Sequence, residues 1–560
     1  MKDKPGKGST TLPATRMNVQ NAILGLRGRD LLSTLRNVGR HGLRHPLHTA
    51  HHLLALGGQL GRVMLGDTPY QPNPRDARFS DPTWSQNPFY RRGLQAYLAW
   101  QKQTRQWIDE SHLNDDDRAR AHFLFNLIND ALAPSNSLLN PLAIKELLNT
   151  GGQSLVRGVA HLLEDLRHND GLPRQVDERA FEVGGNLAAT PGAVVFRNEL
   201  LELIQYKPLS ETQHARPLLV VPPQINKFYI FDLSSTNSFV QYMLKNGLQV
   251  FMVSWRNPDP RHREWGLSSY VQALEEALNA CRSISGNRDP NLMGACAGGL
   301  TMAALQGHLQ AKNQLRRVRS ATYLVSLLDS KFESPASLFA DEQTIEAAKR
   351  RSYQRGVLDG GEVARIFAWM RPNDLIWNYW VNNYLLGKTP PAFDILYWNA
   401  DSTRLPAALH GDLLEFFKLN PLTYPAGLEV CGTPIDLQQV NLDSFTVAGS
   451  NDHITPWDAV YRSALLLGGE RRFVLANSGH IQSIINPPGN PKAYYLANPR
   501  LSSDPRAWFH DAKRSEGSWW PLWLEWITAR SGPLKAPRSE LGNTTYPPLG
   551  PAPGTYVLTR

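Results

Sequence analysis

The sequence predicts an α/β fold in which a mostly parallel sheet is covered by helices on both faces. Apolar runs of strand length alternate with helical stretches from residue 190 to 330 and again from 436 to 532. Gly294-Ala-Cys-Ala-Gly-Gly299 has the small residues of a sharp strand-to-helix turn that lifts one side chain above a sheet. Two polar residues, Asp452 and His480, each follow a later apolar strand. The ends of parallel strands are where such a sheet carries its chemistry, so these positions outline a site.

Length and composition indicate a multidomain protein. The 560 residues are enough for two or three domains, and 42% of them are hydrophobic. No uncharged apolar run is long enough to predict a transmembrane segment, and the basic start of the chain lacks the apolar core of a secretion signal. Three cysteines, Cys281, Cys296 and Cys431, give no disulfide framework. We therefore expect a reducing, cytoplasmic location.

Positive charge is concentrated at the start of the chain. The formal net charge is +9, and ten lysines and arginines before Pro69 face only three aspartates. Such a segment favours an anionic partner, which could be nucleic acid, an acidic surface or a phosphate-bearing substrate. Because the sequence has neither zinc-finger spacing nor the aromatic pattern of RNA-binding sheets, we expect no nucleic-acid partner.

A helical N-terminal domain is predicted for residues 17–189, after a disordered basic segment at residues 1–16. Apolar residues at near-helical spacing from Asn18 to about Asn37 predict a basic helix, which either lies on an apolar or anionic surface or is an ordinary domain helix. Five histidines cluster just after it: His41, His45, His48, His51 and His52. No carboxylate or cysteine accompanies them at ligand spacing, so the sequence predicts no metal site.

An insertion is predicted to split the α/β core. The first part of the core, residues 190–330, opens with a hairpin formed by Ala193–Phe196 and Leu201–Ile204, and the second part spans residues 436–532. Residues 331–435 between them are helical in pattern and unusually aromatic. This pattern favours either a cap that covers an active site or a helical subdomain with its own filled core. One segment can be both. The Pro/Gly-rich residues 533–560 are expected to form a flexible tail.

Cys296, Asp452 and His480 stand in the order nucleophile, acid, histidine, which is the chain order of the α/β-hydrolase fold. His480 would take the thiol proton, because a free thiol is only a few per cent thiolate at about pH 7. Asp452 would fix the imidazole tautomer and stabilise the imidazolium. The predicted fold is thus an α/β-hydrolase fold with a helical cap insertion, preceded by a mainly helical N-terminal domain.

Supporting groups can be assigned around this triad. The Ala297 N–H would donate to the oxyanion of a tetrahedral intermediate, with a second backbone donor from Ile225 or Asn226 in the loop after an earlier strand. His453 is the competing base, and we expect it to support the site or to face the substrate. Cys281 and Cys431 are interpreted as small buried hydrophobes.

A cysteine in place of the usual serine points to thioester chemistry. Attack of a thiolate on an ester gives a thioester, which lies uphill, whereas attack on a thioester exchanges like for like. The sequence therefore favours acyl transfer from a thioester donor such as an acyl-CoA, whose phosphates suit a basic protein. An aromatic cap would keep water from the acyl group. This chemistry requires no metal or other cofactor.

Several long motifs resemble those of the poly(3-hydroxyalkanoate) polymerases, in the same order and along nearly the whole chain. Besides Gly294-Ala-Cys-Ala-Gly-Gly299, they are Val221-Pro-Pro-Gln-Ile-Asn-Lys-Phe-Tyr-Ile230, Ser254-Trp-Arg-Asn-Pro258, Tyr397-Trp-Asn-Ala-Asp401, Gly449-Ser-Asn-Asp-His-Ile-Thr-Pro-Trp457, Ser478-Gly-His480, and an early Asp81-Pro-Thr-Trp84 followed by Asn87-Pro-Phe89.

The resemblance implies that Cys296 is acylated by an (R)-3-hydroxyacyl-CoA and that a polyester grows with release of CoA. It also implies a homodimer that lies on the surface of intracellular polyester granules, with the growing polyester chain as a second partner. Tyr397 and Trp398 become candidates for cap residues that face the substrate. Ala295 precedes the cysteine, as in the single-subunit class that favours medium-length acyl groups.

Two other functions fit part of the sequence. A thioesterase or a polyester depolymerase would use the same triad and would release free hydroxy acid. A granule-coating protein would need only the N-terminal amphipathic stretch and would have no activity.

Overall fold

A computed structural model describes residues 28–331 and 342–560, except residues 75, 170 and 539. The segment at residues 1–16 that is expected to be disordered lies outside the described residues, as does the first half of the predicted helix at Asn18–Asn37. The second half of that helix falls in α2 (Gly28–Arg44). Among the described helices, none combines the length and the apolar character that a membrane crossing needs.

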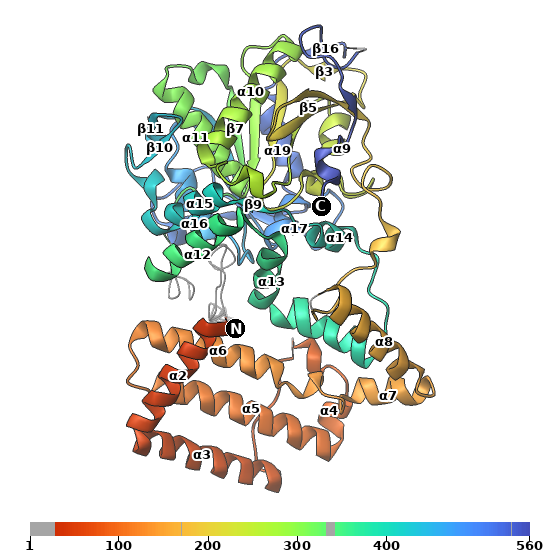
Figure 1. Cartoon of the computed structure of the whole chain (residues 1–560), viewed down its shortest axis with the longest axis vertical. Helices are drawn as coiled ribbons and strands as arrows, with labels where there is room; N and C mark the ends of the chain where they lie inside the picture. Colours follow the sequence, from red (N-terminus) through yellow and green to blue (C-terminus); the bar gives the residue numbers. More distant parts are fainter. Residues whose placement is uncertain (1–27, 75, 170, 332–341, 539) are drawn as a thin grey trace, which may run out of the picture.

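A unit of helices precedes the sheet and lies at one end of the molecule (Figure 1). Asparagine side chains cap the N-termini of three of its helices: Asn87 caps α5, Asn114 caps α6 and Asn140 caps α7. Phe79, Trp84 and Tyr97 fill one small core within it. After α2, the helices of this unit are α3 (Pro46–Leu65), α4 (Thr83–Gln86), α5 (Pro88–Asp109), α6 (Asp115–Ala131), α7 (Pro141–Asn149) and α8 (Gln153–His168).

The main sheet has eleven strands, and its six central strands are parallel. This confirms the predicted parallel sheet, and the antiparallel pair β1–β2 confirms the predicted hairpin. In spatial order the strands are β15 (Lys513–Glu516), β14 (Tyr494–Ala497), β13 (Arg471–Ala476), β12 (Asp443–Gly449), β7 (Ser320–Leu324), β6 (Asn291–Ala295), β4 (Pro217–Val221), β5 (Gln249–Trp255), β2 (Leu201–Tyr206), β1 (Gly192–Arg197) and β17 (Gly550–Pro551). A separate small pair joins β3 (Gln213–His214) to β16 (Leu534–Lys535).

Both faces of the central strands are buried, which explains their continuous apolar sequences. In β4, Leu219 packs in a core with α10 (Leu267–Ser285) and α11 (Ala297–Ala311). Its neighbours Leu218 and Val220 point to the other face, towards α9 (Phe239–Lys245) and the tryptophans of α19 (Trp520–Thr528). The sheet therefore stands as a rigid layer whose strand ends can carry a site. Short helices α16 (Trp457–Leu465), α17 (His480–Ile484) and α18 (Pro505–Asp511) complete the second half of the core.

The insertion between β7 and β12 contains helices and two small strand pairs. Its helices are α12 (Glu342–Arg355), α13 (Gly360–Met370), α14 (Asp394–Ala400) and α15 (Ala407–Leu419), with two π-helical segments at Asn373–Trp377 and Trp380–Leu385. Strand β8 (Val357–Leu358) pairs with β9 (Leu405–Pro406), and β10 (Leu428–Val430) pairs with β11 (Thr433–Ile435).

The N-terminal helices are joined to this insertion by direct contacts. The Tyr384 hydroxyl donates to Asp165 of α8 at 2.8 Å, and the Asn383 side chain donates to the carbonyl of Arg174 at 2.6 Å. Gly158 of α8 lies so close to the π-helical segment that an added Cβ would be 1.9 Å from the Tyr384 carbonyl oxygen. The backbone of α8 thus packs directly on the insertion.

The structure differs from the expected flexible tail at residues 533–560. Strand β17 adds to the edge of the main sheet beside β1. The fully buried Glu202 carboxylate accepts hydrogen bonds from Thr555 N and Oγ1, both at 2.9 Å, and from Tyr556 N at 3.0 Å. A buried carboxylate needs such partners, so these hydrogen bonds and the short strands hold the Pro/Gly-rich tail against the core.

Candidate active site

Cys296 lies in the sharp turn between β6 and α11, with a left-handed backbone φ of 49°. The surrounding glycines are there because the turn leaves no space for side chains. A Cβ on Gly299 would lie 2.0 Å from Ser326 Oγ, one on Gly294 would lie 2.7 Å from the Gly299 Cα, and one on Gly298 would lie 2.4 Å from the Val221 carbonyl oxygen. The Gly-x-Cys-x-Gly-Gly pattern therefore follows from the close approach of strand, helix and the loop after β4. The thiol is half-buried.

Asp452 and His480 meet at the same edge of the sheet, after β12 and β13. The His480 Nδ1 lies 2.7 Å from Asp452 Oδ2, and both side chains are buried. Cys296 lies close enough to the imidazole that its side chain contributes to the raised pKa of His480. Because Nδ1 is used by Asp452, Nε2 is left for the thiol. The structure thus brings together the three residues that the sequence selects.

Asp452 is held by a full set of donors. Its Oδ1 accepts from Ile454 N at 2.8 Å and Thr455 N at 2.9 Å, while Oδ2 accepts from Thr455 Oγ1 at 2.7 Å as well as from His480. Thr455 was not singled out from the sequence, although it lies three residues after Asp452, at the spacing of a local side-chain cap.

The pKa shifts of this pair have opposite directions. Burial alone would raise the pKa of Asp452 and lower that of His480, but their charge interaction and hydrogen bond outweigh burial. The pKa of Asp452 is lowered, and the pKa of His480 is raised to about 10. The Asp452 carboxylate therefore stabilises the imidazolium that forms when His480 accepts a proton.

The expected oxyanion donors lie around the turn. Ala297 is the first residue of α11, where backbone N–H groups have no acceptor within the helix. Ile225 and Asn226 lie in the loop after β4, against Ser402 and Thr403 of the insertion, and the Thr403 N–H donates to the Ile225 carbonyl at 3.4 Å. Donation by Ala297, Ile225 or Asn226 to a substrate stays a prediction.

His453 is half-buried beside Asp452. Burial, and then the Arg371 guanidinium of the insertion, lower the pKa of His453 to about 4, despite the opposing charge of Asp452. The ring is therefore neutral at physiological pH. The Asp452 carboxylate bonds His480, so His453 does not occupy the place of the triad base.

Tyr397 and Trp398 differ in their surroundings. Trp398 is buried in the core, where its Nε1 donates to the Lys227 carbonyl at 2.7 Å. Nearby, a buried ion pair joins Lys227 Nζ to Asp401 Oδ1 at 2.7 Å, and the Tyr229 hydroxyl donates to Asp401 Oδ2 at 2.8 Å. These contacts join the Val221–Ile230 motif to the Tyr397–Asp401 motif and hold α14 against the loop after β4. Packing in the core therefore explains the presence of Trp398.

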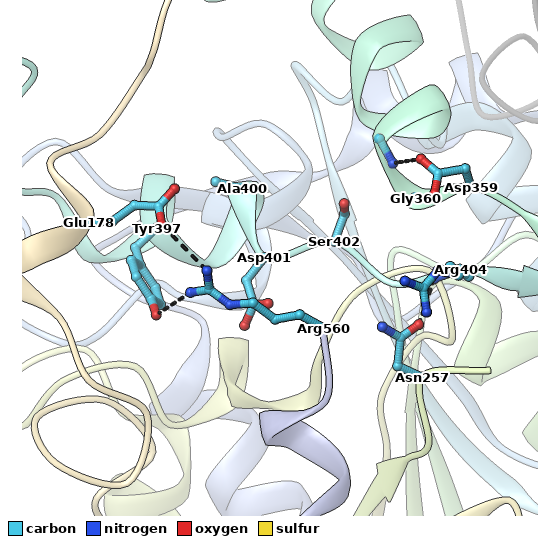
Figure 2. Close-up of a pocket in the computed structure, with 11 residues that line it drawn as sticks. Glu178, Asn257, Asp359, Gly360, Tyr397, Ala400, Asp401, Ser402, Arg404 and Arg560 are labelled. Atoms are coloured by element: carbon cyan, nitrogen blue, oxygen red, sulfur yellow. Dashed lines mark hydrogen bonds and ion pairs between the residues drawn. The ribbon is translucent and has the colours of Figure 1, made fainter. Parts of the chain in front are cut away.

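Tyr397 borders a cavity of about 170 Å³ (Figure 2). The side chain of the last residue, Arg560, reaches into it, with Nη2 3.3 Å from the Tyr397 hydroxyl and Nη1 3.7 Å from a Glu178 carboxylate oxygen. Asp401 and Arg404 also line the cavity, so its walls are largely charged. That Tyr397 faces a substrate group stays a prediction.

The other cysteines lie elsewhere. Cys281 is fully buried in α10, and burial raises the pKa of its thiol. Cys431 differs from the expected buried hydrophobe, because it is half-buried in the β10–β11 turn, where its thiol donates to the Ser268 carbonyl at 3.3 Å. Neither is placed beside His480.

Comparison with known proteins identifies the family. The model of the poly-beta-hydroxybutyrate polymerase (PhaC) N-terminus matches residues 75–243, and that of the alpha/beta hydrolase fold matches residues 217–487, which confirms the predicted fold class. Poly(3-hydroxyalkanoate) polymerase 2 of Ectopseudomonas oleovorans is 94% identical over 560 residues, which is the whole of both chains. Poly(3-hydroxyalkanoate) polymerase 1 of the same organism is 55% identical and covers 96% of each chain.

More distant proteins are also similar. Poly(3-hydroxyalkanoate) polymerase subunit PhaC of Cupriavidus necator is 40% identical over 87% of this chain and 83% of its own. Among solved structures, a monoacylglycerol lipase of Paleococcus ferrophilus aligns with a TM-score of 0.33 and 11% identity, over 59% of this chain and 99% of its own. The resemblance seen in the motifs is confirmed by the full-length matches, and the chain belongs to the poly(3-hydroxyalkanoate) polymerases.

Proposed function

We propose that this protein polymerises (R)-3-hydroxyacyl-CoA thioesters into poly(3-hydroxyalkanoate) and releases CoA, through an acyl-cysteine intermediate on Cys296. One observation carries the proposal: a cysteine in a left-handed turn lies near a histidine that is hydrogen-bonded to a buried aspartate, in a chain of the polymerase family. A cysteine there suits a thioester donor better than an ester donor.

The first half-reaction loads the enzyme. His480 accepts the thiol proton of Cys296, and the thiolate attacks the thioester carbonyl of the substrate. The oxyanion that forms is bound by the Ala297 N–H and by a backbone donor at Ile225 or Asn226. When the carbon–sulfur bond to CoA breaks, CoA leaves with the proton held by His480. The products are CoA and an acyl group on Cys296.

The second half-reaction extends the polymer. His480, now neutral again and oriented by Asp452, accepts the proton of a 3-hydroxyl group. The alkoxide oxygen attacks the carbonyl of an acyl thioester, an ester bond forms, and the carbon–sulfur bond breaks. The released sulfur takes up the proton from His480. Water has to be excluded during this step, because it would compete with the hydroxyl and release free acid.

The acyl groups are proposed to be of medium length. Ala295, directly before the nucleophile, is a small residue packed in the apolar core around β6. A small side chain here leaves more room than a large aromatic one would.

The cytoplasmic granule surface is the proposed location. Helices α2 and α3 expose apolar side chains to solvent: Leu32, Leu35, Leu43, Leu47, Leu54 and Leu65. Together with the basic residues of this region, such a face suits an apolar polyester surface that carries anionic groups. A second exposed apolar row on α8, with Val156 and Leu166, is the proposed contact of a homodimer, which light scattering would detect.

One experiment tests the reaction. Purified protein receives (R)-3-hydroxydecanoyl-CoA, and mass spectrometry looks for the acyl group on the Cys296 peptide while CoA and polymer are quantified. Cys296→Ala should abolish all three signals, whereas Cys431→Ala, a matched change away from His480, should keep them. Free hydroxy acid without polymer would indicate a thioesterase. Full activity of Cys296→Ala would contradict the proposal.

A further inference from the structure

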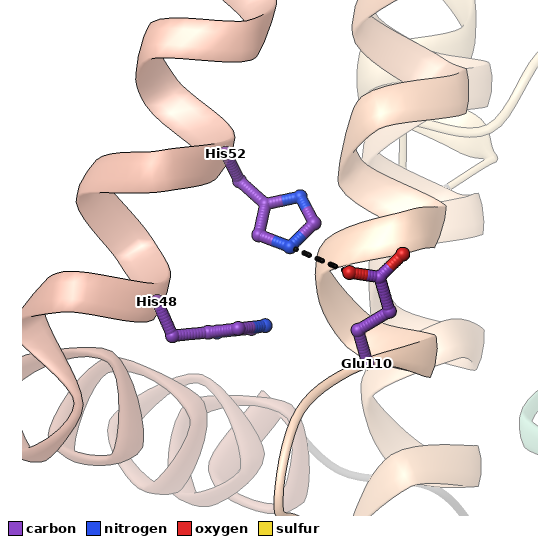
Figure 3. A group of neighbouring side chains, drawn as sticks. All are labelled: His48, His52 and Glu110. Atoms are coloured by element: carbon purple, nitrogen blue, oxygen red, sulfur yellow. Dashed lines mark ion pairs between the residues drawn. The ribbon is translucent and has the colours of Figure 1, made fainter.

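Three potential metal ligands meet in the N-terminal helices. His48 and His52 are four residues apart on α3, so their rings lie on one face of the helix. Glu110 directly follows the last residue of α5, and both rings point towards it (Figure 3). One ligand atom from each residue lies within 4.8 Å of the others. Two imidazoles and a carboxylate are a common ligand set for Zn²⁺.

One pair of atoms already has the separation of two ligands of a single ion. His52 Nε2 lies 3.2 Å from a Glu110 carboxylate oxygen. Ligands bound at about 2.0–2.1 Å in a tetrahedral site are about 3.3 Å apart. The longer distances to His48 can close by rotation of its side chain, because His48 is only half-buried.

Three of the four ring nitrogens of His48 and His52 lack a hydrogen-bond partner among the described residues. Both nitrogens of His48 and Nε2 of His52 are shielded from solvent and have no hydrogen bond among the described residues. The His52–Glu110 contact is thus close in distance but not aligned as a hydrogen bond. Unpartnered buried polar atoms are destabilising, and a metal ion would give them a partner.

A polar chain behind His52 is able to orient the ring. His52 Nδ1 lies 2.5 Å from Gln103 Nε2, and Gln59 Nε2 donates to Gln103 Oε1 at 2.9 Å. A metal-binding histidine usually donates its second N–H to an acceptor, so the Gln103 carbonyl oxygen has to take the place of Gln103 Nε2. When the Gln103 carbonyl faces Nδ1–H, the lone pair of Nε2 points towards Glu110, and rotation of the two amides provides that arrangement.

We propose that His48, His52 and Glu110 bind one divalent transition-metal ion of the zinc class, with water at the remaining position, and that the ion ties α3 to the end of α5. Nitrogen ligands favour Zn²⁺ and its neighbours over Mg²⁺ or Ca²⁺, which prefer oxygen. The sequence predicts no metal site because Glu110 lies far from the histidines along the chain. The helix packing supplies the missing carboxylate.

The test measures metal binding by the full chain. Protein is stripped with a chelator and titrated with Zn²⁺ against a chromophoric competitor, and Co²⁺ is used to report coordination by its visible spectrum. The variants are His48→Gln and Glu110→Gln, of which the second alters an exposed side chain and should fold normally. The control is His51→Gln, an exposed histidine on the same helix. Further arms are His45→Gln and Cys296→Ala.

We expect one ion per chain and a rise in the unfolding temperature with Zn²⁺. His48→Gln and Glu110→Gln should each weaken binding by about tenfold or more and remove the temperature rise, while His51→Gln should change neither. The proposal is overturned if the stripped protein binds no Zn²⁺, or if His51→Gln weakens binding as much as His48→Gln. It is also overturned if only His45→Gln or Cys296→Ala removes the ion, because the ion would then lie elsewhere.

Discussion

Replacement of Asp452 by asparagine tests the proposed triad at its most buried member. The asparagine side chain of this variant can keep the carbonyl oxygen that accepts from Ile454 N and Thr455 N. Its NH₂ group then takes the place of Oδ2, 2.7 Å from His480 Nδ1. Two donors cannot face each other, so His480 must present the lone pair of Nδ1 and carry its proton on Nε2. That proton would point at Cys296, and the imidazole could no longer accept the thiol proton.

The expected loss of rate follows from this tautomer change. Comparable replacements in acyl-transfer triads lower kcat by about 10⁴ while the geometry stays intact. We expect a loss of about 10³–10⁴ in CoA release, which corresponds to about 4–5.5 kcal/mol of transition-state stabilisation. Loss of the charge-assisted hydrogen bond should also lower the free energy of unfolding by about 1–3 kcal/mol.

The assay compares CoA release, acylation of the Cys296 peptide and the unfolding midpoint. Asp504→Asn is the matched control, since Asp504 is an exposed aspartate that caps α18 through Arg506 N at 3.0 Å. It should keep the activity of the unaltered protein. If folded Asp452→Asn retains more than about a tenth of the rate, His480 does not need Asp452, and the proposed roles of both residues are refuted.

Three further predictions concern stability. Gly158→Ala should lower the free energy of unfolding by about 1–3 kcal/mol, because the added Cβ clashes with the Tyr384 carbonyl. Gly93→Ala in α5 has open space around it and should raise the free energy of unfolding by about 0.5–1 kcal/mol. Urea unfolding measures both changes. Glu202→Gln should weaken the hold on the chain end, so that carboxypeptidase removes Arg560 faster than from the unaltered protein. The raised pKa of His480 gives stability that is full below about pH 6.5 and is lost as the pH rises through about 10; unfolding midpoints should lose this dependence in His480→Gln.

The central residues of the site could be predicted because their signals are local. Cys296 is marked by the glycines that the turn requires, and Asp452 and His480 each follow an apolar strand within a few residues. The topology of a parallel sheet then brings strand ends to one edge without further information. Chain order and local spacing were therefore sufficient for the three residues that the structure brings together.

Other features depend on contacts between distant segments, which periodicity does not reveal. Glu110 reaches His48 and His52 only through the packing of α5 on α3. The composition of the tail after Pro533 predicts a flexible segment, but backbone N–H groups of the tail donate to Glu202 and hold it in place. Composition does not reveal such bonds, because every residue except proline has a backbone N–H group. Trp398 was selected as a substrate-facing residue, but its indole nitrogen has its partner in the core.

The contacts of the insertion include bonds to two different parts of the molecule, the N-terminal helical unit and the loop after β4. At its π-helical segment, Tyr384 and Asn383 are bonded to the N-terminal helical unit, and at α14, Asp401 is bonded to Lys227 and Tyr229 of the core. Loop residues 386–393 connect these two attachments (Figure 1). The far end of α14 continues into the Ser402–Thr403 segment, which lies beside Ile225 and Asn226. Because those two residues are the proposed oxyanion donors, the insertion supports the backbone of the proposed site, and its π-helical segment meets the helical unit at a position of the kind that is often functional.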